Sequence, residues 1–389
     1  MSPTSSQLHD PPGAVTPAVL VSPASATTPP SVGSVGSALA GDAATTLERL
    51  GYRVLGYQRH DVHVVRYDAA RHEQLWDSFL PQTVNGNLFQ TRRFLKYHPP
   101  GRFVDHSLLF FDSDELLAVA AGEETEGRWS AHRFSSHGGL AILPGLRADR
   151  CLDAVLGLLR YATERGWRRL SMRFAPSYLW RGDLDVLHWA LEICGFREQG
   201  KELAWGFLPG PRSEAELLAG YANGARGAVI KARKEAILTV RRSDDLPAYW
   251  RLLQRNLDTR FQVEPTHTLD EMLRIRSLCP HEVSLWGVFH PDAGMIAGAL
   301  IFEVSATGAH TFYSAQDYGF HLLRSTSLLM HELCLEYVVR QQRCLNHGVI
   351  TAHGAEELNL GLSWFKQSFG ARPAVRRTFV YESPACPPE

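Results

Sequence analysis

The chain has 389 residues, enough for two domains that each bury a core. A hydrophobic share of 44% and a charged share of 21% are typical of a soluble globular protein. The formal net charge of −1 argues against a global attraction to nucleic acid or to an anionic membrane. No apolar run reaches the roughly 18 residues that a membrane-spanning helix needs, so we expect no membrane span.

Cysteine and histidine usage indicates a reducing compartment and no metal site. The six cysteines form no CxxC pair and no cluster, which favours reduced thiols and a cytoplasmic location. The 17 histidines include no HExxH motif. His347 and His353 fall in a predicted loop with no carboxylate at a ligand spacing.

Residues 1–44 are rich in Pro, Ser, Thr, Ala and Gly and carry almost no large apolar side chains. Such a segment cannot offset its ordering entropy by burial, so we predict disorder. A basic region followed by an apolar core is missing, so we do not expect a secretory signal.

The first half alternates short strands with helices. We predict strands at 62–67, 107–111, 116–122, 129–134, 170–174 and 202–208, and helices at 69–80, 91–96, 150–165 and 184–193. Pro209-Gly210-Pro211 then marks a break. We therefore predict a first domain at 45–210.

The second half repeats this plan. We predict helices at 213–221, 225–235, 246–259 and 325–341, strands at 237–241, 285–289, 295–304 and 309–315, and a capping box of Thr268 and Glu271 that opens a further helix. The second domain is predicted at 211–383, and residues 384–389 form a tail.

The stretch from Gly354 to Arg377 is the most specific part of the chain. Its apolar residues recur at helical spacing and predict a helix with one face in a core, namely Leu358, Leu360, Leu362, Phe365 and Phe369. Gly370 suits a helix end, and Pro373 stops the helix before a strand at 375–381. Lys366 is either a lysine reaching out to solvent from a buried helix or a cation directed into a site.

The two halves also share residues at a nearly constant offset of about 176 positions. The pairs come from three different elements: Tyr161 with Tyr337, Trp189 with Trp364, and Phe110 with Val288. A period this long indicates a duplicated domain. Lys366 aligns with Leu191, so we expect the active site in the second copy and a degenerate first copy.

The pattern E-L-N-x-G-L-x-x-F-K-x-x-F-G, from Glu357 to Gly370, resembles the C-terminal signature of FemAB-like acyltransferases. FemAB-like acyltransferases are tandem-domain members of the GNAT superfamily. The chain also resembles the acetyltransferase-like proteins of cellulose biosynthesis. The resemblance covers residues 62–381 and is tightest after Arg226. It implies an α+β fold of two tandem GNAT-like domains, each a mixed, mostly antiparallel sheet flanked by helices.

The resemblance implies a loop for coenzyme A. GNAT folds hold the pyrophosphate on a Q/R-x-x-G-x-G/A loop at a helix N-terminus. Gln316 and Gly319 match this loop, His321 departs from it, and Arg324 with Ser325, a predicted N-cap, completes the predicted cofactor-binding set. The alternative is an ordinary strand-to-helix loop.

The same resemblance assigns catalytic roles. Lys366 corresponds to the lysine that lies near the reacting carbonyl in Fem ligases, which implies oxyanion stabilisation. Residues 309–315 resemble the H-T-x-Y-x-A strand, in which His310 or Tyr313 relays a proton. Glu303 is the other candidate base. Strand alternation predicts one face with His310, Phe312 and Ser314 and another with Thr311 and Tyr313.

Six further residues are predicted to bind substrate. Arg226 and Lys231 lie in a basic segment that resembles the phosphate-contacting segment of Fem ligases, and the alternative is a solvated helix face. The others are Arg260, His267, Asn359 and Phe365, of which Asn359 is also a candidate helix cap.

Together these features predict an N-acyltransferase that moves an acyl group from acyl-CoA, most simply acetyl-CoA, to a small or nucleotide-sugar-linked amine. One alternative is an aminoacyl-tRNA-dependent Fem-type ligase, which we favour less because the chain has no long heptad segment for a coiled-coil arm. The other is a non-catalytic scaffold, to which the His321 departure points.

Overall fold

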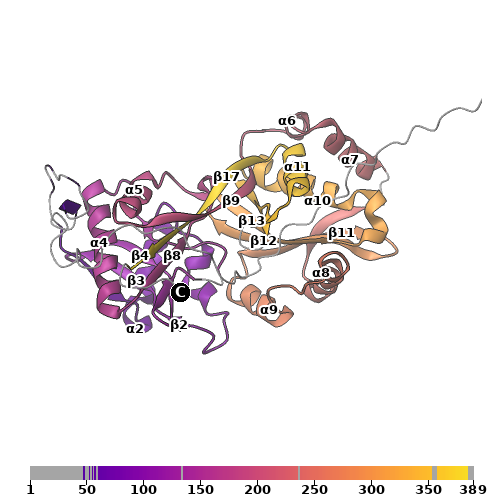
Figure 1. Cartoon of the computed structure of the whole chain (residues 1–389). Helices are drawn as coiled ribbons and strands as arrows, with labels where there is room; N and C mark the ends of the chain where they lie inside the picture. The colour runs from indigo at the N-terminus through magenta and orange to yellow at the C-terminus, as the bar shows by residue number, and fades with distance from the viewer. Residues whose placement is uncertain are drawn as a thin grey trace, which may run out of the picture.

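The computed structural model describes residues 60–132, 135–234, 237–352 and 357–383, together with residues 47, 48, 52, 55 and 57. The chain folds into two lobes side by side, one for each half of the sequence (Figure 1). Two long strands, β9 (Arg197–Phe207) and β17 (Arg372–Glu382), run between them. The predicted N-terminal segment, the tail and His353 lie outside the described residues.

The elements of the first half form largely where local patterns predict them. They are β1 (Val62–Arg66), α2 (Ala69–Phe79), η1 (Leu80–Gln82), η2 (Leu88–Gln90), α3 (Arg92–Leu95), β2 (Val104–Asp105), β3 (Leu108–Asp112), β4 (Glu115–Ala120), β5 (Glu123–Thr125), β6 (Arg128–Ser130), β7 (Ala141–Ile142), α4 (Ala148–Arg165), β8 (Arg169–Arg173), η3 (Ser177–Leu179), α5 (Asp185–Ile193) and β9. The strand predicted at 129–134 is wrong beyond Ser130. His132 has a φ of 44°, outside the extended region, and the chain leaves the sheet there.

The second half begins after β9. Its elements are α6 (Glu214–Ala219), α7 (Asn223–Lys234), β10 (Thr239–Ser243), α8 (Leu246–Phe261), α9 (Leu269–Leu278), β11 (Val283–His290), β12 (Gly294–Ser305), β13 (Gly308–Gln316), η4 (Tyr318–Leu323), α10 (Ser325–Cys334), the π-helical η5 (Leu335–Arg340), β14 (Cys344–Val349), β15 (Thr351–Ala352), β16 (Glu357–Leu358), α11 (Leu360–Ser368) and β17. The capping box of Thr268 and Glu271 is confirmed at the start of α9. His347, predicted in a loop, lies instead in β14, a mostly buried strand that shows no polar alternation.

The predicted C-terminal helix is present as α11, with a narrower buried face than expected. Leu358 and Leu360 are 64% and 66% exposed, because the helix begins only at Leu360. Gly370 follows the helix with a φ of 80°, as predicted. Pro373 was expected to precede the last strand but lies within β17, at an end that pairs with β9 alone, where a missing N–H is tolerated.

Each half donates its last strand to the other half. The long sheet has the order β10-β11-β12-β13-β14-β9-β17-β8-β6-β5-β2, and a smaller sheet, β1-β3-β4-β7, completes the first half. β9 lies between β14 and β17, and β17 pairs antiparallel with β8. Strand pairing therefore crosses the predicted division at residue 210 in both directions.

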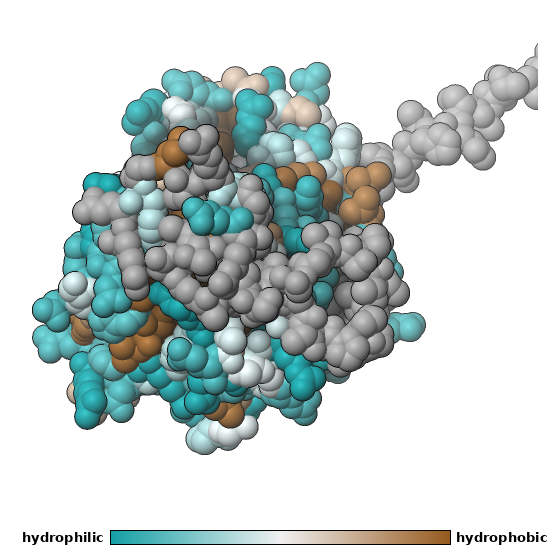
Figure 2. All heavy atoms as spheres, turned by 60° about the vertical axis from the view of Figure 1, so that its left-hand side comes forward, coloured by the Kyte–Doolittle hydropathy of each residue, from teal (hydrophilic) through white to brown (hydrophobic). Residues whose placement is uncertain are grey.

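The apolar cores also join the halves. One cluster lies around α4 and α5 and includes Phe379 of β17, and another lies beneath α7 and α10 and includes Phe207 of β9. A further cluster contains Trp76 and Phe94 from the first half with Tyr249 and Phe302 from the second. The described outer surface of the first lobe is mostly hydrophilic, with scattered apolar side chains (Figure 2). The two halves thus share one buried interior.

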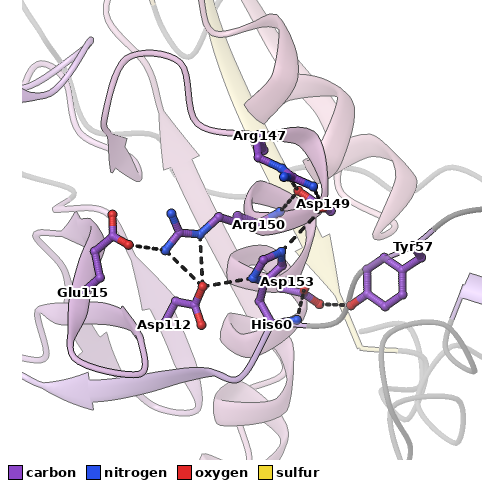
Figure 3. Close-up of polar contacts among 8 residues, drawn as sticks. All are labelled: Tyr57, His60, Asp112, Glu115, Arg147, Asp149, Arg150 and Asp153. Atoms are coloured by element: carbon purple, nitrogen blue, oxygen red, sulfur yellow. Dashed lines mark hydrogen bonds and ion pairs between the residues drawn. The ribbon is translucent and has the colours of Figure 1, made fainter.

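The chain enters the first half through a charged network around His60 (Figure 3). Nδ1 of His60 lies 3.1 Å from an Asp112 oxygen, and Nε2 lies 3.5 Å from an Asp149 oxygen. Arg150 donates to Asp112 at 3.0 Å, and the His60 main-chain N–H donates to Asp153 at 3.1 Å. The network fastens the residues before β1 to the first turns of α4.

Candidate functional site

The two central strands of the second half separate partway along their length. β13 and β14 run parallel and pair only at three positions, which end with His310 opposite Asn346. Beyond this pair, β13 pairs with β12 and β14 pairs with β9. The separation leaves main-chain groups of both strands available to other partners.

Lys366 reaches this separation from α11. Its side chain is 0% exposed, and Nζ donates to the main-chain oxygens of Gly348 and Val349, each at 3.0 Å. Burial holds the pKa of Lys366 well below its ordinary value. Leu191, its counterpart in the first half, is also 0% exposed, so the two copies differ in the charge and not in the burial of this position.

His310 lies beside the same turn of β14. The Asn346 Oδ1 accepts from the Tyr178 hydroxyl at 2.8 Å and from the Gly348 N–H at 3.1 Å. These two bonds orient the amide, so Nδ2 of Asn346 faces Nδ1 of His310 at 3.0 Å and donates to it. The Asn346 main-chain oxygen also lies 3.3 Å from this Nδ1, and the shorter contact with Nδ2 favours the tautomer with the ring proton on Nε2. Burial lowers the pKa of His310 to about 4, so the ring is neutral at pH 7.

A β-bulge changes which side chains of β13 share a face. Leu300 and Ile301 of β12 pair with Tyr313 and Thr311, and the residue between them, Phe312, is extra. As a result Phe312 and Tyr313 pack in the same core cluster. The predicted alternation, with Phe312 and Tyr313 on opposite faces, is therefore wrong.

Tyr313 belongs to a chain of hydrogen bonds that spans both halves. Its hydroxyl lies 3.0 Å from Nδ1 of His267, and Nε2 of His267 lies 3.2 Å from the hydroxyl of Tyr97. Burial lowers the pKa of His267 to about 4 and raises that of both tyrosines. A neutral imidazole between two hydroxyls can pass a proton along this chain.

Glu303 is not brought to this site. It pairs across the sheet with Ala309, so it projects to the face opposite His310. Its oxygens accept from the Tyr337 hydroxyl at 2.8 Å and from Arg343 at 2.6 Å. The expectation that Glu303 serves as a base is wrong for this geometry, because an ion pair holds the carboxylate away from the other candidates.

The predicted cofactor loop has a helix end that favours an anion and a carboxylate that opposes one. Gly319 donates its N–H to Asp317 Oδ1 at 2.9 Å, so a carboxylate of the same loop occupies this amide. Gln316 accepts from the Thr326 hydroxyl at 2.6 Å. The N-cap prediction for Ser325 is wrong, because Arg324, with a φ of 57°, precedes the helix and Ser325 is its first residue. No side chain caps the first turn of α10.

Ser325 nevertheless stands out at this helix end. The residue is 0% exposed, and its hydroxyl oxygen has no hydrogen-bond partner among the described residues. An uncapped helix N-terminus favours an anion, since its first N–H groups are unpaired and the helix dipole is positive there. The residues thus offer a coenzyme A pyrophosphate some contacts and one opposing carboxylate.

The remaining predicted substrate residues are dispersed. Arg226 donates to the main-chain oxygens of Leu218, Ala219 and Tyr221 and so caps the end of α6. Lys231 is exposed on α7. Asn359, Phe365 and Arg260 complete the set.

Asn359 caps α11 by accepting from the Leu362 N–H at 2.8 Å, so its alternative role is confirmed. Phe365 packs against Phe369, with ring centroids 5.2 Å apart. Arg260 lies in α8, but its side chain is outside the described part of the structure.

Sequence reasoning did not identify Asn346 or Tyr178. Asn346 is 1% exposed, and Tyr178, 168 positions earlier, donates to it from the other half. A buried asparagine in an otherwise apolar strand is the only local signal, and its partner is too distant to infer.

The chain shares its fold with solved structures of low sequence identity. In particular, the chain superposes on a structure described as FemX with a TM-score of 0.61 and 14% identity, over 82% of this chain and 97% of that chain. No protein-family model and no curated protein sequence matches the chain.

Two further structures share the fold. One is described as the C-terminal domain of a lysylphosphatidylglycerol synthetase from Agrobacterium fabrum, with a TM-score of 0.51, 12% identity, and coverage of 80% of this chain and 92% of that chain. The other is a conserved protein of unknown function from Bacteroides thetaiotaomicron, with a TM-score of 0.52, 10% identity, and coverage of 82% and 98%.

The described residues contain neither a metal-binding cluster nor a membrane-spanning helix. Among them, no group of three or more His, Cys, Asp or Glu side chains is placed to hold a metal ion. None of their helices is long and apolar enough to cross a membrane.

Proposed function

We propose that this protein is an N-acyltransferase that moves an acyl group, acetyl in the simplest case, from acyl-CoA to a small or nucleotide-sugar-linked amine. The amine nitrogen attacks the thioester carbonyl carbon, whose oxygen becomes an oxyanion. Collapse of the intermediate then breaks the C–S bond. The proton that the amine loses balances the one that the departing thiolate gains.

The observation that carries this proposal is the inward position of Lys366. Burial favours the neutral amine, whose two N–H donors are both held by Gly348 and Val349, so a third donor exists only when the lysine is protonated. The third remains for a developing oxyanion, whose charge in turn favours the protonated lysine. A donor fixed in a dry site contributes about 10² to 10³ in rate.

His310 supplies the proton transfer in this scheme. Because Asn346 donates to its Nδ1, the proton on Nε2 is available to the leaving sulfur. Tyr313 and His267 provide a second route for the proton of the amine.

A second donor class is supported by a specific observation. The Asp317 carboxylate at the Gly319 N–H opposes a pyrophosphate on this loop. That contact favours the aminoacyl ester of a tRNA, as in Fem-type ligases, over acyl-CoA. The same Lys366 and His310 would serve either carbonyl.

A donor panel tests the proposal. The purified protein is heated with acetyl-CoA, a long-chain acyl-CoA or aminoacylated tRNA, because a donor that binds only the native state raises the melting temperature. Stabilisation by acetyl-CoA, with thiol release when an amine mixture is added, is the expected result. Stabilisation by the charged tRNA alone selects the second donor, and no response to any of them contradicts an acyltransferase.

A further inference from the structure

Two arginines from different halves, the buried Arg376 and the partly exposed Arg173, lie on the same face of the long sheet. Thr378 of β17 is directly opposite Arg173 of β8, and Arg376 precedes Thr378 by two residues on the same strand face. Arg173 and Arg376 are therefore diagonal cross-strand neighbours, a relationship that places Cα atoms about 7–8 Å apart.

Only one of these arginines has a counter-ion. Arg376 donates to the Glu202 Oε2 through Nε at 2.9 Å and Nη2 at 2.6 Å, and the other Glu202 oxygen accepts from Thr351 at 3.2 Å. Arg173 forms no ion pair with any described residue, and its Nε is buried without a hydrogen-bond partner. Burial, followed by the positive charge of Arg376, lowers the pKa of Arg173 to about 10. Two guanidinium groups thus face one carboxylate.

A loop of the first half covers this pair and adds further unpaired groups. The Gly138 N–H donates to the Arg173 main-chain oxygen at 2.7 Å, and Arg376 reaches the Ser136 oxygen at 3.5 Å. The Ser136 hydroxyl and both ring nitrogens of His137 are buried and have no hydrogen-bond partner among the described residues. Leaving such groups unpaired costs about 1–3 kcal/mol each, so their retention calls for a ligand.

We propose that Arg173, Ser136 and His137 bind an anionic group of a substrate, a carboxylate or a phosphate. An anion with several acceptor oxygens supplies the missing counter-charge of Arg173 and accepts from the hydroxyl and the imidazole. Buried water can satisfy the hydrogen bonds, but it cannot balance the excess charge.

The location connects this anion site with acyl transfer. The His137 ring lies 5.9 Å from the His310 ring, centroid to centroid. A substrate held by its anionic group at Arg173 would therefore extend toward the separation of β13 and β14. This place in the reaction rests on the proposed function, whereas the binding of an anion does not.

Anion titrations test the site directly. The melting temperature is followed against inorganic phosphate and against acetate at constant ionic strength, for the wild type and for Arg173→Met. The matched control is Arg169→Met, which removes the same charge from the same strand, where Arg169 pairs with Glu382. We expect a saturable rise for the wild type and the control, and its loss in Arg173→Met.

Each outcome of these titrations either supports or overturns the anion site. A response to phosphate alone identifies a phosphate-bearing substrate, and a response to acetate alone identifies a carboxylate. An unchanged response in Arg173→Met, or no saturable response of the wild type to either anion, overturns the site. Ser136→Ala, a small change, should weaken binding several-fold and covers the case in which Arg173→Met does not fold. Anion binding without turnover would keep this site and reject the proposed function.

Discussion

The Nζ of Lys366 and the main-chain oxygen of Gly348 are 3.0 Å apart, and this hydrogen bond ties α11 to the point where β14 leaves β13. The lysine is thereby bound to an internal strand of the long sheet and does not lie on the solvent-facing side of the helix. Its replacement affects both the rate and the local hydrogen bonding.

Lys366→Met should fold and lose at least about 100-fold in kcat, because one fixed oxyanion donor contributes about that much. Unfolding should become easier by about 1–3 kcal/mol, since the Gly348 and Val349 oxygens lose a donor. Steady-state kinetics and urea unfolding measure the two effects. Lys201→Met, which removes an exposed lysine 3.7 Å from Glu198, is the control. A folded Lys366→Met variant with wild-type kcat would refute the assignment.

Asn346→Asp should reverse the tautomer of His310. A carboxylate accepts a proton from Nδ1 where the amide donated to it, so the imidazole proton moves away from Nε2. We expect kcat to fall at least about tenfold, because general acid catalysis typically contributes more than that. Nitrogen NMR shifts of His310 report the tautomer. An unaltered tautomer with unaltered kcat would show that Asn346 does not set the proton position.

Stability should decline as the pH falls from about 6.5 to about 4. The unfolded chain takes up a proton on His267 near pH 6.5, whereas burial delays this uptake in the native state until about pH 4. This contribution is constant above neutral pH and is lost on acidification. Urea midpoints at pH 7 and pH 5 measure it. His267→Gln should reduce the dependence by the share of one histidine, since His310 and other buried histidines contribute in the same direction, whereas His281→Gln, at an exposed position, should leave it unchanged.

Asp317→Ala should tighten coenzyme A binding several-fold if acyl-CoA is the donor. The change frees the Gly319 N–H and removes a negative charge from the loop. Calorimetric titration gives the Kd, and Asp292→Ala, in the exposed β11–β12 turn, is the control. If coenzyme A binds neither protein, the tRNA-linked donor is favoured instead.

His60→Ala should lower the free energy of unfolding by about 1–2 kcal/mol, since it removes a side chain held between Asp112 and Asp149. Chemical denaturation measures the change, with His281→Ala as an exposed control. Acyl transfer should be unaffected, because the network belongs to the outer part of the first half. A loss of turnover without a loss of stability would contradict this structural role.

Local pattern predicted much of the fold and only part of the site. Helical spacing predicted the inward face of α11, on which Leu362 and Phe369 are buried, but it left open whether Lys366 points inward or to solvent. The fold of the Fem-type proteins that the motif resembles is shared by this chain, as its superposition on the structure described as FemX shows. The predicted alternation of strand faces is wrong at Phe312, because the amino-acid sequence does not reveal that β13 has an extra residue there.

Long-range pairing is what the sequence did not reveal. Tyr178 and Asn346, or Arg173 and Arg376, meet through strand registers that no window of neighbouring residues encodes. The face of the sheet on which Glu303 lies could not be predicted either, because it depends on the pairing of Glu303 with Ala309. Such contacts follow from topology, whereas helices and turns follow from local chemistry.

The position of β17 has a consequence for how the protein is made. The strand inserts between β9 and β8, yet it is synthesised after every other described helix and strand. Until then β8 lacks its neighbour on one side, and the earlier lobe keeps an unpaired edge that invites aggregation. Completion of the first lobe therefore waits until β17 has been synthesised, and a chain that stopped before Arg372 would leave both lobes without this strand.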